Sequence, residues 1–165
     1  MIGMIKLVSR TGNVENFIDP TAKIGEGTNV WHYAVVLADV VIGSECSIGS
    51  HCEIGRGSKI GSGARISNGV FLPSNSIIGV GVFIGPGVIF TDDKYPVSGN
   101  VGYKSEPPCV GDWASIGAGA VILPGVVIGC NAMIGAGSIV TREVPRGTII
   151  RGDPSRISRC LSVNS

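Results

Sequence analysis

One apolar residue recurs at every sixth position along almost the whole chain. The first register runs unbroken through Ile18, Ile24, Val30, Val36, Ile42, Ile48, Ile54, Ile60, Ile66, Leu72, Ile78, Ile84 and Phe90. A second register follows through Val110, Ile116, Ile122, Ile128, Ile134 and Val140. Neither the period of a helix nor the two-residue alternation of a strand produces this spacing. A period of six is typical of a parallel β-helix, in which each hexad makes one short strand and one turn. We therefore predict an all-β fold.

Each hexad has its own geometry. The anchor points inward, the fifth position holds a second, smaller inward residue, and the position after the anchor is usually Gly, which suggests crowding at a turn. Cys46 and Cys52 occupy the small inward slot, so we expect them to be buried fillers. Three hexads make one turn of a triangular prism, so residues 18 apart stack and the anchors predict about six coils.

The register breaks once. After Phe90 the next anchor is due at residue 96 but arrives at Val110, which implies an inserted loop at residues 96–109. An excursion from a strict repeat is a place where function is expected. We predict a single β-helix domain over residues 1–157 with this loop inserted, followed by a C-terminal tail at 158–165.

The composition excludes several classes of protein. The net charge of +1 gives no electrostatic case for a nucleic-acid partner. No run of 18 apolar residues is present, and the N-terminus does not resemble a signal peptide, so we expect a cytoplasmic protein with no membrane association.

Three stretches resemble the hexapeptide-repeat acyltransferases, whose fold is a left-handed β-helix. They are the repeat IGxGxx, the segment IGAGAVILPGVVIGCNAMIGAGSIVTREVP at Ile116–Pro145, and RGDPSRI at Arg151–Ile157. The resemblance implies an acyltransferase that uses acetyl-CoA as co-substrate and needs no metal. It also implies a homotrimer with its sites between subunits, in keeping with the apolar surface expected at Trp31 and Tyr33.

Two shorter motifs narrow the resemblance. VWHYAVV at Val30–Val36 and FTDDKYP at Phe90–Pro96 resemble the branch that acetylates 3-amino nucleotide sugars for bacterial surface polysaccharides. That branch commonly reads T-N-D in the second motif, and here Asp92 stands at the Asn position. The implied reaction is N-acetylation of an amino sugar nucleotide.

The acceptor type can also be argued from the residues. A hydroxyl needs a general base such as His to attack a thioester, whereas a neutral amine needs mainly positioning. The inserted loop contains no His, since the only histidines of the chain are His32 and His51. This favours an amine acceptor.

Four residues are candidates for the catalytic site. Asp92 and Asp93 open the loop, where they either orient the acceptor amine or take its proton; the alternative is that they only cap the turn. His32 and Asn68 share a column two coils apart, roughly 9–10 Å by strand spacing, and either face the sugar or, for His32, pack at an interface. His51 is expected to be an exposed turn residue.

Five residues are implied by the resemblance to bind acetyl-CoA. Ala118 and Ala136 match positions whose backbone meets the pantetheine arm, Thr141 and Arg142 match a pair near the nucleotide, and Arg156 matches a basic residue near the 3′-phosphate. Arg is well suited to phosphate.

Three alternatives remain open. An O-acetyltransferase would use His32 or His51 as its base. A γ-type carbonic anhydrase needs three His around zinc, more than this chain has. A non-enzymatic β-helical scaffold would leave the inserted loop and the coenzyme-like C-terminal half without a purpose.

Overall fold

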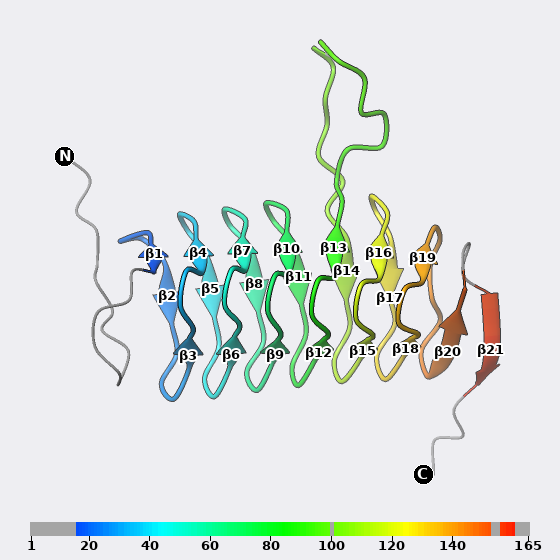
Figure 1. Ribbon diagram of the computed structural model, residues 1–165, viewed down its shortest axis with the longest axis horizontal. Helices are drawn as coiled ribbons and strands as arrows, with labels where there is room; N and C mark the ends of the chain where they lie inside the picture. Colours follow the sequence, from blue (N-terminus) through cyan, green and yellow to red (C-terminus); the bar gives the residue numbers. More distant parts are fainter. Residues whose placement is uncertain (1–15, 100, 153–155, 161–165) are drawn as a thin grey trace.

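The chain forms a left-handed parallel β-helix of seven turns, drawn as a long prism in Figure 1. The structure is a computed structural model that describes residues 16–99, 101–152 and 156–160, and for 156–160 only the backbone. The segment before residue 16, which the sequence suggested as a cap for one end, lies outside the described residues. Within the described residues every regular element is a strand.

The strands form three flat sheets, one on each side of the prism. Sheet A contains β1 (Phe17–Ile18), β4 (Val35–Val36), β7 (Glu53–Ile54), β10 (Phe71–Leu72), β13 (Ile89–Phe90), β16 (Val121–Ile122) and β19 (Ile139–Val140). Sheet B contains β2 (Lys23–Ile24), β5 (Val41–Ile42), β8 (Lys59–Ile60), β11 (Ile77–Ile78), β14 (Cys109–Val110) and β17 (Val127–Ile128). Sheet C contains β3 (Asn29–Val30), β6 (Ser47–Ile48), β9 (Arg65–Ile66), β12 (Phe83–Ile84), β15 (Ser115–Ile116), β18 (Met133–Ile134), β20 (Thr148–Arg151) and β21 (Arg156–Cys160).

The core is the column of anchors that the six-residue period predicted. Every anchor is buried except Ile24 and Val30, which are half-buried in the first turn. The residue before each anchor points outward, because side chains alternate along a strand. Cys46 and Cys52 are buried at 2% and 1% exposure, so the prediction that they are small fillers is confirmed.

The glycine that follows most anchors is required by the coil above it. A Cβ on Gly49 would lie 2.6 Å from the backbone nitrogen of Asn68, a distance that real Cβ atoms essentially never show. The crowding expected at this position is therefore present, and it lets successive coils stack at the spacing of strands in a sheet.

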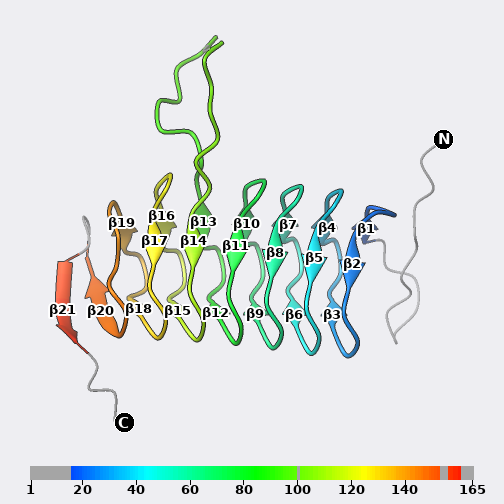
Figure 2. The ribbon, with the colours of Figure 1, turned by 180° about the vertical axis from the view of Figure 1, so that it is seen from behind.

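The inserted loop leaves the prism after β13 and returns at β14, and both ribbon views show it projecting as one long arm (Figures 1 and 2). Strand partners are 18 residues apart below the loop and 32 apart across it, as in Ile77↔Cys109. The neck is closed by the Glu106 N–H, which donates to the Asp92 carbonyl at 2.8 Å. The Gly125 N–H donates to the Glu106 carbonyl and so joins the end of the loop to the next coil of the prism.

The last turn departs from the register. Met133 pairs with Ile149, an offset of 16, because the turn after β19 is two residues short and Val144 makes only an isolated bridge to Ile128. The anchor count therefore gave about six coils where the structure has seven. Strand β21 then runs antiparallel to β20 and covers the edge of sheet C (Figure 2). Across the described ranges, no helical segment is present that is long and apolar enough to cross a membrane.

Candidate functional site

Turns that follow sheet C stack into one edge of the prism, which we call the CA corner because it joins sheet C to sheet A. Its second turn position holds, coil by coil, His32, Ser50, Asn68, Pro86, Ala118 and Ala136. Backbone bonds tie the column together, from His51 N–H to the His32 carbonyl at 3.2 Å up to Gly137 N–H to the Ala118 carbonyl at 2.8 Å. Two predicted catalytic residues and two predicted coenzyme residues thus share a single corner.

The remaining predicted residues lie elsewhere. Asp92 and Asp93 follow β13, and Thr141 and Arg142 follow β19, so all four belong to the edge between sheets A and B, which we call the AB corner. Arg156 begins β21 beside sheet C, and its side chain lies outside the described atoms. Within one chain, therefore, the five predicted coenzyme residues are not gathered on one edge, and the two carboxylates do not share the corner of His32.

Asp92 holds the two arms of the loop together. Its Oδ2 accepts hydrogen bonds from the Tyr103 hydroxyl at 2.6 Å and from the Ser105 hydroxyl at 2.7 Å. This raises the pKa of Tyr103, chiefly because the phenol O–H donates a hydrogen bond to the Asp92 carboxylate, which favours the protonated phenol. Asp93 accepts from the Tyr95 backbone N–H at 2.9 Å, an Asx turn. Both carboxylates therefore shape the loop, as the turn-capping interpretation requires.

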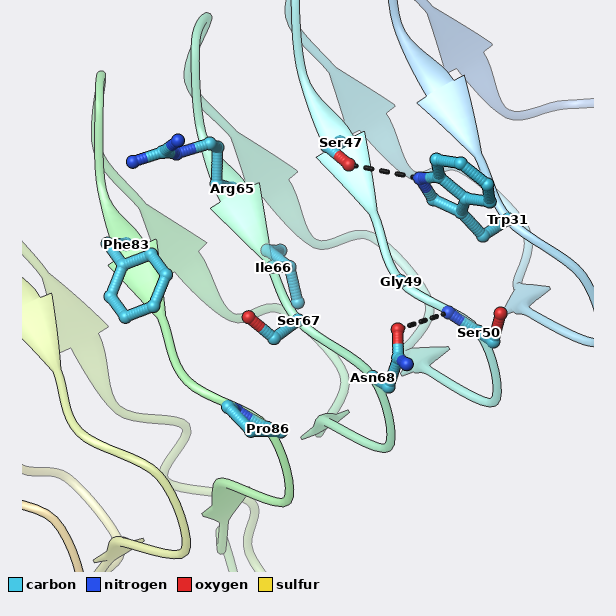
Figure 3. A pocket seen from close by; sticks show the side chains of 10 residues that line it. All are labelled: Trp31, Ser47, Gly49, Ser50, Arg65, Ile66, Ser67, Asn68, Phe83 and Pro86. Carbon is cyan, nitrogen blue, oxygen red and sulfur yellow. Dashed lines mark hydrogen bonds between the residues drawn. The ribbon is translucent and has the colours of Figure 1, made fainter.

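A hollow of about 620 Å³ lies beside the CA corner on the outer side of sheet C (Figure 3). It is lined by Trp31, Ser47, Gly49, Ser50, Arg65, Ile66, Ser67, Asn68, Phe83 and Pro86. Asn68 was predicted as a site residue, but Ser47, Arg65 and Phe83 were not. The sequence does contain the pattern that predicts their position. Each directly precedes an anchor, so its side chain points outward, and the spacing of 18 residues places the three on neighbouring strands of sheet C.

Two contacts fix the aromatic walls of the hollow. The Trp31 indole N–H donates to Ser47 Oγ at 3.2 Å, although the Trp31 side chain is 52% exposed. The Arg65 guanidinium carbon lies 5.8 Å from the centre of the Phe83 ring, within cation–π range. Figure 3 shows Trp31 at one end of the hollow and Phe83 with Arg65 toward the other.

Asn68 makes a bond that limits its chemistry. Its Oδ1 accepts the Ser50 backbone N–H at 3.0 Å, as Asp112 Oδ1 accepts the Val80 N–H at 2.8 Å on another corner. One lone pair of the amide oxygen is engaged by the coil below, so Asn68 can offer a ligand its NH2 donor and the remaining lone pair of Oδ1. Asn68 can therefore orient a ligand oxygen but is not a base.

The histidines belong to an aromatic cluster in the first two turns. Tyr33 and His51 stack with ring centres 5.1 Å apart and planes 17° apart, and His32 meets Tyr33 edge-on at 6.5 Å. His51 is exposed at a turn, as predicted, and adopts a positive φ of 57°. Tyr33 and His51 occupy the third turn position of the CA corner, which glycines fill in the later turns.

Those glycines leave the upper part of the corner open. Gly87, Gly119 and Gly137 have positive φ, and a Cβ at each would meet no atom within 4 Å. Together with the exposed Ala118 and Ala136 they form a strip of accessible backbone, which we call the CA ledge. Such a strip suits an extended chain that seeks backbone hydrogen bonds.

Among the described residues, no group of three or more His, Cys, Asp or Glu side chains is placed to hold a metal ion.

Comparison with known proteins agrees with this architecture. A model of the bacterial transferase hexapeptide (six repeats) matches residues 21–56, and a model of the hexapeptide repeat of succinyl-transferase matches residues 109–142. A hexapeptide-repeat-containing acetyltransferase from Vibrio cholerae is 25% identical, with a TM-score of 0.58 over 86% of this chain and 74% of that one. A hexapeptide transferase family protein from Anaplasma phagocytophilum, 24% identical, shares the fold with a TM-score of 0.64 over 90% of this chain and 81% of that one.

Curated relatives match over a shorter length. A 2,3,4,5-tetrahydropyridine-2,6-dicarboxylate N-acetyltransferase from Staphylococcus aureus is 42% identical over 59 residues, which are 36% of this chain and 25% of the relative. The enzyme of the same name from Clostridium perfringens is 41% identical over 66 residues, 39% of this chain and 28% of the relative. The match thus spans about a quarter of these relatives. The matched repeats at residues 21–56 and 109–142, and the coil that they build, are similar to those of hexapeptide-repeat transferases.

Proposed function

We propose that the protein is an acetyl-CoA-dependent N-acetyltransferase that acetylates the amino group of an amino sugar nucleotide in surface-polysaccharide biosynthesis. The observation that carries this proposal is the CA corner, where the hollow and the CA ledge follow one another along a single edge. The names of the relatives support acetyl transfer to nitrogen, although they name a different acceptor.

The CA ledge is suited to the pantetheine arm. The arm is extended and carries amide groups, so it binds where backbone is accessible along a straight edge. Ala118 and Ala136 lie on this strip, and Pro86, the last residue of the column that lines the hollow, precedes Ala118 by one coil, roughly 4.8 Å by strand spacing. A thioester near Pro86 would therefore face an acceptor held in the hollow.

The chemistry asks little of the protein beyond placement. The neutral amine attacks the thioester carbonyl, the new C–N bond forms, the C–S bond breaks and coenzyme A leaves as thiolate, with the amine proton passed to a nearby base or solvent. Bringing the two reactants together in this geometry supplies much of the rate enhancement. In this proposal the Asn68 NH2 group holds a ligand oxygen during the attack, and its orientation is supported by the bond from the Ser50 N–H to Asn68 Oδ1.

A homotrimer unites the separated site residues. In a closed ring of three copies, one edge of each prism contacts a different edge of the next, a heterologous interface. If the AB corner meets the CA corner of its neighbour, the loop with Asp92 and Asp93 and the pair Thr141 and Arg142 approach the hollow and the CA ledge. Arg156 would then serve the 3′-phosphate from the end of the prism. The exposed Tyr33 is in keeping with such packing.

The test is an acetyl-transfer assay with radiolabelled acetyl-CoA against UDP- and dTDP-linked amino sugars. The same nucleotide sugars with a hydroxyl in place of the amine, and a tetrahydropyridine dicarboxylate, serve as competing acceptors. We expect product only from an amino sugar nucleotide, and a trimeric mass by sedimentation. Transfer to the hydroxyl compounds or to the dicarboxylate alone, or a monomer at micromolar concentration, would contradict the proposal.

A further inference from the structure

The hollow beside the CA corner has the chemistry of an anion site. Arg65 is its only charged lining residue, and in the part of the chain that the structure describes no carboxylate pairs with it. Three serines and Asn68 supply further hydrogen-bonding groups. A guanidinium that no carboxylate neutralises is well suited to phosphate, which it meets with two parallel hydrogen bonds.

The Trp31 end of the hollow offers a flat aromatic surface. An exposed side chain of this size normally samples several rotamers, but the indole N–H of Trp31 is fixed by Ser47 Oγ. The ring is therefore pre-oriented, which reduces the entropy lost when a planar ligand stacks on it. Stacking of a base on an aromatic side chain is largely insensitive to the identity of the base.

The Arg65 end is equally pre-organised. The guanidinium lies over the Phe83 ring, on the next strand of sheet C, and this contact restricts a side chain that is otherwise exposed. Arg65 lies two coils beyond Trp31, roughly 9–10 Å along the prism by strand spacing. A ribose and its 5′ oxygen bridge a separation of this order between a base and a diphosphate.

We propose that this hollow is a nucleotide subsite, in which the base stacks on Trp31 and the diphosphate binds Arg65 on its Phe83 support. The assignment rests on the proposed function and defines how the nucleotide sugar is oriented along the prism. The nucleotide lies toward the N-terminal end of the prism, and the sugar amine points along the CA corner toward Ala118. The 620 Å³ volume is within the usual range for small-molecule sites.

Intrinsic fluorescence provides a direct test, because the chain has two tryptophans, Trp31 and Trp113, and both are exposed. UDP or dTDP, added without acetyl-CoA, should quench the parent and the Trp113→Leu variant. Quenching should disappear in Trp31→Leu. Trp113 lies after β14 on the edge between sheets B and C, so its variant is a matched control. Quenching that depends on Trp113, or no quenching at all, would overturn the subsite.

Calorimetry tests the phosphate end. Arg65→Met should weaken UDP binding about tenfold or more, since charge-assisted hydrogen bonds contribute in this range. Lys59→Met removes an exposed cation from sheet B and should leave binding unchanged. Trp31→Leu should weaken UDP about fivefold or more through lost stacking, yet spare inorganic diphosphate. Equal affinities of the parent for UDP and inorganic diphosphate would rule out the base site.

The remaining outcomes also discriminate. If pimelate, a small dicarboxylate, binds as tightly as UDP and Trp31→Leu affects neither, the hollow is a carboxylate site and the proposal is wrong. If no nucleotide binds and the Arg65 and Trp31 variants dissociate the oligomer, a second copy of the chain occupies the hollow. Both binding experiments omit acetyl transfer. If the protein binds UDP in this way but fails to acetylate an amino sugar nucleotide, the subsite stands and only the proposed function is contradicted.

Discussion

The Tyr103 hydroxyl donates a 2.6 Å hydrogen bond to Asp92 Oδ2 and so joins the returning arm of the inserted loop to the residue where the loop leaves the prism. Ser105 donates to the same oxygen at 2.7 Å. Asp92 is therefore a structural tether of the loop, whatever further part it takes in the reaction. Asp92 directly follows strand β13, so the coil fixes its position, and its two hydrogen bonds hold the returning arm of the loop.

The tether should weaken at alkaline pH. An unfolded tyrosine loses its proton near pH 10, roughly its reference value, whereas the Asp92 carboxylate holds the pKa of Tyr103 above its ordinary value. The stabilising contribution is therefore complete below the unfolded pKa and is lost as pH rises through the higher folded pKa. We expect an alkaline absorbance titration to lose its latest-titrating tyrosine in Tyr103→Phe. Tyr95→Phe, in the same loop, is the control, and an unchanged late phase in Tyr103→Phe would contradict the assignment.

Substitutions at Asp92 separate tethering from proton transfer. Asp92→Asn keeps an oxygen that can accept from Tyr103 and Ser105, so we expect it to retain most acetyl-transfer activity. Asp92→Ala loses both bonds, and its activity should fall together with that of Tyr103→Phe. General-base catalysis contributes about 10²–10⁴-fold. A loss of that size in Asp92→Asn, with an intact oligomer, would show that Asp92 is the base.

An amine acceptor makes the histidines dispensable. Activity should rise with pH toward the pKa of the amine and then level, because only the neutral amine attacks. We expect His32→Ala to cost less activity than Asp93→Ala, which loses the cap on the Tyr95 N–H. His51→Ala should remain active. Abolished transfer in either histidine variant, with acetyl-CoA still bound, would favour the O-acetyltransferase alternative.

Side chains added on the CA ledge should block acetyl-CoA. Gly119 has a φ of 66°, and Asn is tolerated in this region, as Asn75 and Asn131 demonstrate at φ of 61° and 58°. Gly119→Asn places an amide where an extended arm would lie, so we expect acetyl-CoA affinity to fall about tenfold, the cost of roughly one lost neutral hydrogen bond. Gly63→Asn, at φ of 70° between sheets B and C, is the matched control and should bind normally. Similar losses in both variants would point to general destabilisation.

The stacking of the coils should be most sensitive where a Cβ meets backbone. Gly49→Ala forces a Cβ against the Asn68 nitrogen at 2.6 Å, so we expect a loss of about 1–3 kcal/mol in the free energy of unfolding. In Gly135→Ala the nearest atom is the Arg151 Cβ at 3.0 Å, a side-chain atom of the last turn, and the loss should be smaller. Denaturant unfolding of the two variants measures the difference, and equal losses would show that the coils accommodate the added methyl group.

Much of this molecule could be predicted from the sequence because its core is periodic. The anchors predict the all-β coil, since an inward residue every six positions fits neither a helix nor a simple strand. They also locate the inserted loop, because the register breaks after Phe90. The column from His32 through Asn68 was also predictable, because residues 18 apart stack in such a coil. Counting the hexads also separates the coenzyme residues, because it assigns Ala136 to the CA corner and Thr141 to the AB corner.

Tertiary structure decided what the period does not encode. Outward side chains and loop residues are not constrained by core burial, so the Trp31 to Ser47 bond, the Arg65 contact with Phe83 and the Tyr103 tether depend on rotamers and on neighbours in other coils. The short final turn could not be predicted from the period either. There an inward residue does break the repeat, because Val144 is buried at the inward place that the register assigns to residue 146. A hydrophobic repeat specifies which residues are inside, and the site is made by those that remain outside.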